Sequence, residues 1–344
     1  MQEPPRRRFL PLAAARYEAG DLALSLPAGV GSGQPAAPAE VDSARQAQAK
    51  QYARRRQVLS LVNLAVSALL VSVLLFTPLD FALRDALTGA SGWQPVRGWH
   101  PFVVGAYFLV VFAASTLLTL PLSYYSSFVL AHRYGLSTQT RRGWLFDLLK
   151  GLVISLPFEL LAVEFVYALL ALAPDTWWIW AGIAVLCVTV LLANLAPILF
   201  LPLFYKLTPL PDGEIRRLAL ELAARANTRV RGIYSMNMSK RTTAANAMVM
   251  GLGNTRRIVL GDTLLDRYTP DEIEVVLAHE LGHQVHHDIP KLIMIEVVTT
   301  LGGLFAVNLA LHAVVGAVPG YASLADAATL PLVAAALGIF GLVT

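Results

Sequence analysis

Residues 269–290 read Thr-Pro-Asp-Glu-Ile-Glu-Val-Val-Leu-Ala-His-Glu-Leu-Gly-His-Gln-Val-His-His-Asp-Ile-Pro, and this stretch decides what kind of domain the chain can build. Thr269 and Glu272 have the spacing of a capping box, and Pro270 occupies the first helical position between them. Pro290 stops or bends a helix at the other end. The pattern therefore predicts one well-delimited helix of about 20 residues.

This predicted helix carries the pattern His-Glu-x-x-His. His279 and His283 lie one helical turn apart on one face, so that two imidazole nitrogens can meet a single Zn²⁺. Glu280 then lies beside the water on the metal, where it can act as a catalytic base. The alternative is a chance match on an ordinary helix, which the start and stop signals around the motif disfavour. We therefore predict Zn²⁺ as cofactor, His279 and His283 as its ligands and Glu280 as the catalytic residue.

The composition of the chain places it in a membrane. Of its 344 residues 56% are hydrophobic and 15% are charged, whereas a soluble domain carries about 25% charged residues. A helix needs about 20 apolar residues to cross a bilayer. Six runs of that kind are predicted as spans, at residues 57–78, 101–124, 151–173, 177–200, 292–316 and 325–344. For the last two, which are rich in Gly and other small residues, buried core helices are the alternative.

These runs divide the chain into four parts. Residues 1–56 have no sustained hydrophobic pattern and predict a flexible cytoplasmic tail. Residues 57–205 predict a region of four transmembrane helices. The polar stretch 206–290 predicts a cytoplasmic metallopeptidase module that contains the zinc helix, and residues 291–344 predict two further transmembrane helices.

The positive charges predict how the chain is oriented. If the N-terminus is cytoplasmic, segments 1–56, 132–150 and 201–291 share one side with 9, 4 and 12 Lys and Arg residues. The other side receives only Arg84 and Arg97. By the positive-inside rule this predicts a multi-pass cell-membrane protein whose N-terminus and zinc site are cytoplasmic. The basic residues are spread over that side without interleaved aromatics, so the lipid bilayer is the expected partner and nucleic acid is not.

The polar stretch has the pattern of a small α+β unit. Pro211-Asp212-Gly213-Glu214 opens a helical pattern that runs to about Asn227. Residues 230–238, 244–250 and 257–260 have strand patterns. The predicted fold class is therefore mainly α, a polytopic membrane helix bundle with a small α+β, gluzincin-like zinc-metallopeptidase module on the cytoplasmic side.

Several short blocks in the chain occur in the order and spacing of a known family. They are Tyr134–Thr140, Pro202–Leu210, Ser239-Lys240-Arg241, Ala245-Asn246-Ala247, Arg257–Leu260 with Asp262–Leu265, and the zinc helix. Over roughly residues 100–300 the chain resembles the type I CAAX prenyl protease family of integral-membrane zinc metalloproteases. The heat-shock membrane metalloprotease family shares the zinc helix but is shorter before it, and Asp288 fits both families.

The resemblance implies a function for the segment before the zinc helix. Asn246 and Ala247 would lie on an edge strand that holds the substrate by backbone hydrogen bonds, a mode that accepts any extended peptide. An ordinary hairpin with Asn246 in its turn is the alternative. The implied activity is hydrolysis of peptide bonds in peptide or membrane-protein substrates, prenylated ones included.

A catalytic zinc needs a third protein ligand, and the resemblance implies a glutamate from a helix well downstream. After the zinc helix, the only carboxylates are Glu296 and Asp326. Glu296 would lie about 20 Å along the axis of a continuous helix. Asp326 falls on the opposite side of the membrane. We therefore expect the chain to be truncated, without its third ligand and its transition-state stabiliser.

Five further residues have predicted positions but open roles. Glu159 is expected near the membrane interface, and Glu164 is expected to line a cavity inside the bundle. His286 and His287 are either outer groups of the zinc site or solvated, and Asp288 is a candidate to orient a ligand histidine. The rival functions are a heat-shock-type quality-control protease, a scaffold without zinc, and a transporter.

Overall fold

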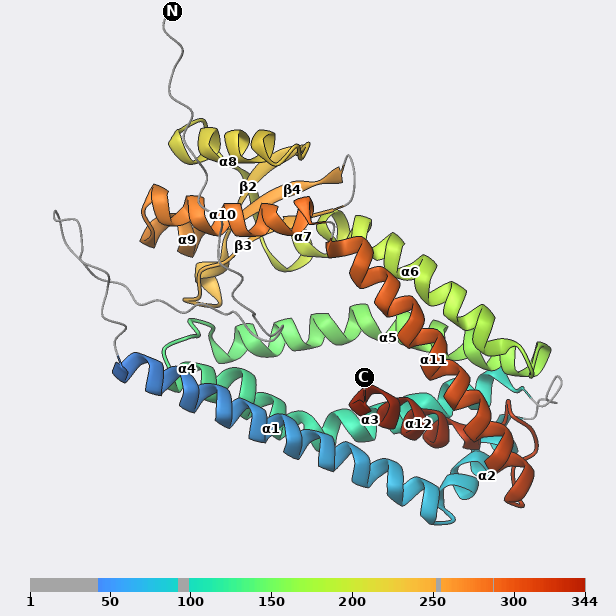
Figure 1. Ribbon diagram of the computed structural model, residues 1–344. Helices are drawn as coiled ribbons and strands as arrows, with labels where there is room; N and C mark the ends of the chain where they lie inside the picture. The colour runs from blue at the N-terminus through green and yellow to red at the C-terminus, as the bar shows by residue number, and fades with distance from the viewer. Residues whose placement is uncertain (1–42, 92–98, 252–254, 287, 344) are drawn as a thin grey trace, which may run out of the picture.

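The computed structural model describes residues 43–91, 99–251, 255–286 and 288–343. Long helices form one part of the molecule, and a small four-stranded sheet with its own helices forms the other (Figure 1). Most of the predicted tail, residues 1–42, lies outside the described residues.

The long helices and their connecting elements lie before and after the sheet in the sequence. They are α1 (Ser43–Phe76), α2 (Leu79–Ser91), α3 (Pro101–Tyr124), the π-helix η1 (Tyr125–Leu130), α4 (Ala131–Arg133), α5 (Arg141–Leu172), α6 (Trp177–Leu199), α7 (Leu201–Phe204), α11 (Asp288–Ala317), η4 (Ala327–Thr329) and α12 (Leu330–Val343). The chain is therefore mainly helical, as predicted.

Among the described residues, five helices are long and apolar enough to cross a membrane. They cover Gln46–Phe76, Pro101–Arg133, Arg141–Leu172, Trp177–Leu195 and Pro290–Ala317. The first five predicted spans are thereby confirmed as membrane-length helices. The sixth, predicted at 325–344, is helical over the 14 residues of α12. Those residues measure about 21 Å, which is short of a bilayer core.

The prediction of a flexible tail up to residue 56 is wrong for its last part. α1 begins at Ser43 and runs for 34 residues without a break. Residues 43–56 are mostly Ala, Gln, Arg and Lys, which are good helix formers. Because the apolar span behind them is already helical, each added residue extends an existing helix and needs no new nucleus.

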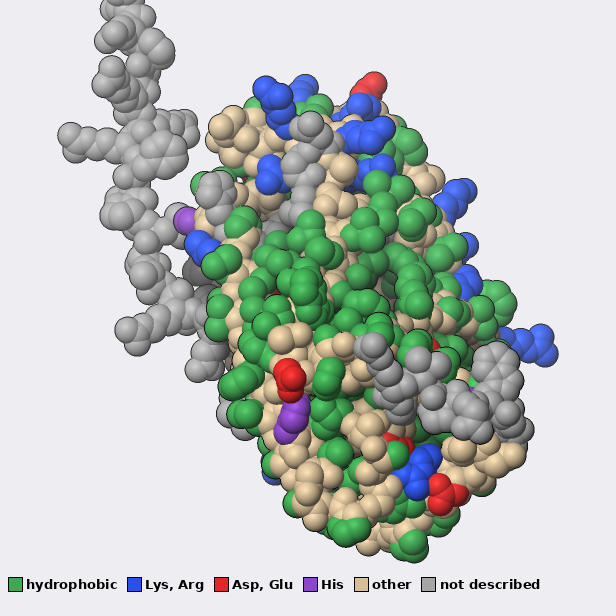
Figure 2. Space-filling model, turned by 90° about the vertical axis from the view of Figure 1, so that its right-hand side faces the viewer, with side chains coloured by type: hydrophobic (Ala, Val, Ile, Leu, Met, Phe, Trp, Pro, Cys, Tyr) green, Lys and Arg blue, Asp and Glu red, His purple; other side chains and the backbone are tan. Residues whose placement is uncertain are grey.

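The surface of the helical part carries large apolar side chains where a soluble protein would carry polar ones. Phe158, Leu161 and Val153 on α5 are 58%, 68% and 73% exposed. A broad apolar area covers the middle of the molecule, with Lys and Arg side chains gathered toward one end (Figure 2). Such an area is far larger than an exposed patch on a soluble monomer, which agrees with a lipid-facing surface.

The sheet has four strands in the order β1-β2-β4-β3. The strands are β1 (Leu207–Pro209), β2 (Gly232–Met236), β3 (Ala247–Met250) and β4 (Arg257–Gly261). β2 and β4 run parallel, while β1 and β3 pair antiparallel to their neighbours. The three predicted strands are confirmed. β1 was not predicted, because it has three residues and one of them is Pro209.

Helices α8 (Glu214–Arg225) and α10 (Pro270–Val285) pack on one face of this sheet, and the short α9 (Asp262–Arg267) joins β4 to α10. Their shared core is formed by Ala219, Ala223, Ile233, Ala247, Ile258, Leu260, Ile273, Leu277 and Leu281. We call this unit, residues 206–286, the α+β module.

A buried polar cluster ties the bundle together at the end far from the module (Figure 1). The Tyr107 hydroxyl donates to Asp80 over 2.6 Å, and burial raises the pKa of the Asp80 carboxyl to about 6. Arg84 on α2 donates to Asp326 over 2.7 Å. Asp326 also accepts from the backbone N–H groups of Ala322 and Ala328. Helix α2, which was not predicted, is thus bound to the loop before α12.

This cluster predicts a large stability difference between two neighbouring ion pairs of Arg84. Asp326 is 3% exposed and Asp85 is 65% exposed. Replacing Asp326 with Ala removes the buried partner of a mostly buried guanidinium, which keeps only the exposed Asp85 carboxylate and the Gly320 carbonyl, and should cost about 2–3 kcal/mol. The matched control Asp85→Ala should cost less than about 1 kcal/mol. Unfolding of the detergent-solubilised protein measures both, and equal losses would contradict the assignment.

Candidate metal centre and substrate edge

Helix α10 begins as the sequence predicts. Glu272 N–H donates to the Thr269 hydroxyl over 3.4 Å, and the Thr269 N–H donates to the Glu272 carboxylate over 2.9 Å. Both halves of the capping box are therefore present.

The predicted end of this helix is wrong by a few residues. α10 stops at Val285 after 16 residues, and Pro290 lies in the first turn of α11. A proline in a first turn costs no helical hydrogen bond, so the residue begins the next helix and does not end α10.

The two faces of α10 have opposite surroundings. Ile273, Leu277 and Leu281 recur every four residues and are buried against the sheet. His279 and His283 lie on the other face and are exposed. Their ring centres are 5.0 Å apart, and the rings meet edge to face. The structure thus brings together the two histidines on the side of α10 that the core does not use.

This spacing fits a zinc ion. A tetrahedral zinc bound at about 2.1 Å to each of two ring nitrogens places the ring centres roughly 5 Å apart. Within the described residues, no group of three or more His, Cys, Asp or Glu side chains is gathered tightly enough to hold a metal. The two imidazoles are the part of a donor set that this structure shows. Glu296 lies on α11, where it accepts a hydrogen bond from Thr300.

Glu280 follows the first histidine and is half-buried. Burial raises the pKa of its carboxyl above the ordinary value, and electrostatic interaction with the His279 and His283 side chains opposes that rise. A carboxyl with a raised pKa exchanges protons more readily near neutral pH than a solvated one. Its position between the two histidines in the sequence suits proton transfer at the metal.

His283 has a carboxylate partner. Its Nδ1 lies 2.8 Å from Oδ2 of Asp288, and this hydrogen bond holds the pKa of Asp288 below its usual range. A carboxylate only accepts hydrogen bonds at neutral pH, so Nδ1 donates this bond, and Nε2 is the ring nitrogen that can face a metal. Outer carboxylates orient metal-binding histidines in this way. His286 is exposed, and His287 lies outside the described residues.

Asn246 and Ala247 lie at the start of the edge strand β3. The Gly261 N–H donates to the Asn246 carbonyl over 2.8 Å, so Asn246 takes part in the ladder and does not sit in a turn. Bonded residues alternate along an antiparallel strand. Ala247 and Val249 therefore direct their backbone N–H and C=O groups to the open edge, and β3 packs beside α10.

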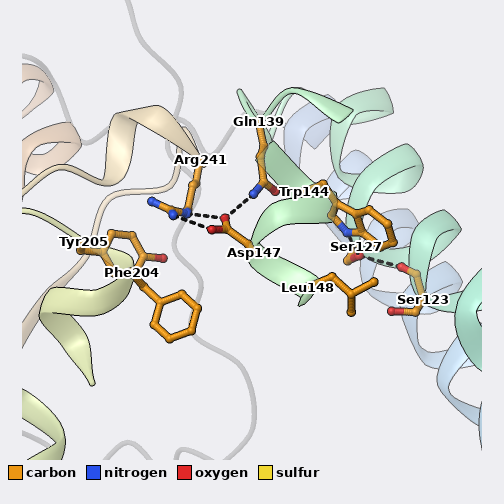
Figure 3. Close-up of a pocket in the computed structure, with 9 residues that line it drawn as sticks. All are labelled: Ser123, Ser127, Gln139, Trp144, Asp147, Leu148, Phe204, Tyr205 and Arg241. Carbon is orange, nitrogen blue, oxygen red and sulfur yellow. Dashed lines mark hydrogen bonds and ion pairs between the residues drawn. The ribbon is translucent and has the colours of Figure 1, made fainter. Parts of the chain in front are cut away.

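A cavity of about 410 Å³ lies where the membrane helices meet the module (Figure 3). Arg241 of the module and Asp147 of α5 form a bidentate pair there, with N–O distances of 2.7 and 2.8 Å. Gln139 donates to the same carboxylate over 2.6 Å. This pairing raises the pKa of the Arg241 guanidinium, which also lies over the Tyr205 ring.

The same junction is held by backbone hydrogen bonds. The loop before α5 forms an isolated β-bridge with the module, Ser137 opposite Thr242. Thr138 N–H donates to the Arg241 carbonyl, and Thr243 N–H donates to the Leu136 carbonyl. The chain that leads into β3 is therefore fixed to the membrane helices. Arg241 belongs to the block Ser239-Lys240-Arg241, and Asp147 was not predicted as its partner. The one signal for Asp147 in the sequence is that it is a single acidic residue near the start of an apolar run.

The two intramembrane glutamates differ in their contacts. Glu164 accepts a hydrogen bond from the Trp99 indole over 3.2 Å. Glu159 is exposed on the surface of α5.

A bundle of membrane-length helices that carries a small α+β module with a His-Glu-x-x-His helix defines the class of multi-pass membrane metalloproteases. Comparison with known families agrees. Residues 33–206 match the family described as "CAAX prenyl protease N-terminal, five membrane helices", and residues 209–342 match "Peptidase family M48". The chain belongs to the M48 family and to its CAAX prenyl protease group.

Individual relatives point the same way. The chain is 32% identical over 252 residues to "Probable CAAX prenyl protease 1" of Schizosaccharomyces pombe, covering 71% of this chain and 53% of that protein. It is 33% identical over 215 residues to "Uncharacterized metalloprotease YhfN" of Bacillus subtilis, covering 60% and 50%. The match to the S. pombe protein, together with the N-terminal family match, favours the CAAX prenyl protease group over the heat-shock family.

A solved structure is also similar. The crystal structure of Ste24p from S. mikatae superimposes with a TM-score of 0.68 at 26% identity, covering 81% of this chain and 64% of that one. The chain spans about half the length of the curated relatives it matches.

The junction predicts strong coupling between Arg241 and Asp147. In a double-mutant cycle with alanine at each position, we expect a coupling of about 1–3 kcal/mol, because the pair is bidentate and only about a fifth to a quarter exposed. The exposed pair Arg216 and Asp212 within the module is the matched control. Its coupling should stay below about 0.5 kcal/mol. Similar coupling energies for the two pairs would show that the Arg241–Asp147 pair is no stronger than an exposed surface pair.

Proposed function

We propose that this chain forms the membrane region and the zinc-binding module of an endopeptidase. The observation that carries the proposal is the pair His279 and His283, 5.0 Å apart on the exposed face of α10. Glu280 follows the first of them, and an open strand edge lies beside the helix. In this proposal residues 57–205 and 291–344 hold the enzyme in the bilayer, and residues 206–290 perform the chemistry.

The proposed chemistry is hydrolysis of a peptide bond with Zn²⁺ as the metal. When bound, zinc polarises the scissile carbonyl and makes water a stronger acid. His279 and His283 would hold it through ring nitrogens, with a carboxylate as the third protein ligand, a combination found in other zinc peptidases.

The side chains of α10 would then move the protons. Glu280 takes a proton from the attacking water and delivers it to the leaving amine. Asp288 keeps His283 in the tautomer that presents Nε2, so the ligand needs no reorientation. Glu280 and His283 lie on α10, and Asp288 contributes from the first turn of α11.

The substrate would bind as an added strand. Ala247 and Val249 offer unpaired backbone groups along β3, and an extended peptide can pair with them whatever its side chains. Asn246 lies exposed where that edge begins. Since the relative from S. pombe is named a probable CAAX prenyl protease, we propose the C-terminal region of a prenylated protein as the substrate class.

The module is proposed to face the cytoplasm. Gln51 near the start of α1 accepts a hydrogen bond from Tyr134, and the loop after Tyr134 pairs with the module. The basic start of α1 and the module therefore share one end of the bundle. The positive-inside rule assigns the end with more Lys and Arg to the cytoplasm.

Variants of α10 test the metal and the catalytic residue separately. Glu280→Gln should keep one zinc per protein and lose at least about a hundredfold in kcat, because the proton acceptor is gone. His279→Ala should lose the zinc itself.

Elemental analysis and cleavage of a farnesylated peptide by the full-length protein measure these outcomes. His286→Ala, one residue past α10, serves as the control and should retain metal and activity. Activity in Glu280→Gln would remove this residue from catalysis. A folded protein that binds no zinc would favour a scaffold over a peptidase.

Asn246→Ala tests the substrate edge. We propose that the exposed Asn246 side-chain amide adds one hydrogen bond to the peptide, and its loss should lower kcat/KM about tenfold while zinc content stays unchanged. Thr208→Ala is the matched control, since Thr208 is exposed on β1 at the opposite edge of the same sheet. If both variants behave alike, β3 is not the binding edge.

A further inference from the structure

A second cavity, of about 480 Å³, opens between α1 and η1 at the module end of the bundle. It is lined by Gln51, Arg54, Arg55, Val58, Leu59 and Tyr125. We propose that this cavity is a binding site for the headgroup of an anionic phospholipid. The proposal concerns membrane binding and does not depend on peptidase activity.

The donors around the cavity suit a phosphate. Among the described residues, no carboxylate pairs with Arg54 or Arg55. A third guanidinium, that of Arg133, does not line the cavity but donates over 3.2 Å to the hydroxyl of Tyr125, which does. Guanidinium groups bind phosphate oxygens through parallel charge-assisted hydrogen bonds. The site therefore offers several positive donors to one anion.

The cavity lies where the basic start of α1 meets its apolar span, and this position favours a lipid over a free phosphate. α1 has its last basic residue, Arg56, directly before a run that contains no charged side chain until Asp80. Val58 and Leu59 line the same cavity only about 6 Å farther along the helix than Arg54 and Arg55. Phosphate would lie among the arginines, and the acyl chains would continue along the apolar residues.

Contacts with a second element hold the cavity in shape. The Tyr134 hydroxyl donates to Gln51 Oε1 over 3.1 Å, which leaves the Gln51 amide N–H groups available to the ligand. The Tyr52 and Tyr134 rings also meet at 5.1 Å. The start of α1 is thus bound to the loop that pairs with the module. A lipid in this cavity would therefore contact α1, which is held in place by the loop that follows Tyr134.

Lipid retention by the purified full-length protein tests the proposal. The probes are phosphatidylglycerol and phosphatidylcholine, added to the detergent-solubilised protein and counted by native mass spectrometry. We expect phosphatidylglycerol to bind preferentially. The double variant Arg54→Gln with Arg55→Gln should bind it about 30-fold more weakly, because it removes two charge-assisted contacts to the phosphate in the cavity.

The matched control is Arg141→Gln with Arg142→Gln. It removes the same charge at the start of α5, on the same end of the bundle, and does not line the cavity. Its affinity for phosphatidylglycerol should stay within about twofold of that of the wild type, because neither side chain lines the cavity and exposed charges farther away are screened. Equal losses in both double variants would mean diffuse attraction to the surface and would overturn the site, as would full retention by the Arg54 and Arg55 variant.

Competition with inorganic phosphate distinguishes a phospholipid ligand from a free phosphate ion. We expect it to displace phosphatidylglycerol only weakly, because it lacks the acyl chains that Val58 and Leu59 would contact. Binding of phosphate as tight as that of the lipid would overturn the lipid assignment. Circular dichroism and zinc content of each variant show that its fold is intact, so a failure here is distinguishable from a failure of the peptidase proposal.

Discussion

The division of α10 into two faces is the constraint on which the site depends. Ile273, Leu277 and Leu281 must be buried against the sheet for the module to have a core, and this fixes the rotation of the helix. The histidines at 279 and 283 then have to point away from the core. The packing of the module thereby sets the positions of both imidazoles, on a helix that packs beside β3.

That arrangement would be of little use if the module moved freely on the membrane helices. The Arg241–Asp147 pair and the β-bridge at Ser137 attach the chain before β3 to α5 and its preceding loop. The edge strand β3 is therefore held in a fixed position relative to the membrane helices. At the end of the bundle far from the module, the ion pair between Arg84 and Asp326 holds α2 against the loop before α12.

Local sequence predicted the features that depend on neighbouring residues. The capping box at Thr269 and the spacing of the two histidines depend on a few adjacent positions. The composition of each apolar span likewise indicates that it lies in lipid. The end of α10 was missed by a few residues because Pro290 fits the start of the next helix as well as the end of the previous one. The helical start of α1 was missed because residues 43–56 have no apolar pattern, although they extend a helix formed by others.

The sequence by itself determined that the chain lies in a membrane, that it has a small α+β module and that one helix presents two histidines. These properties follow from hydrophobicity and helical periodicity, which act over a few residues. Only the tertiary structure decided that β3 is an edge strand, that Asp288 contacts His283 and that Asp147 pairs with Arg241, 94 positions away. Such contacts depend on how the chain folds back on itself, and spacing along a sequence does not encode them.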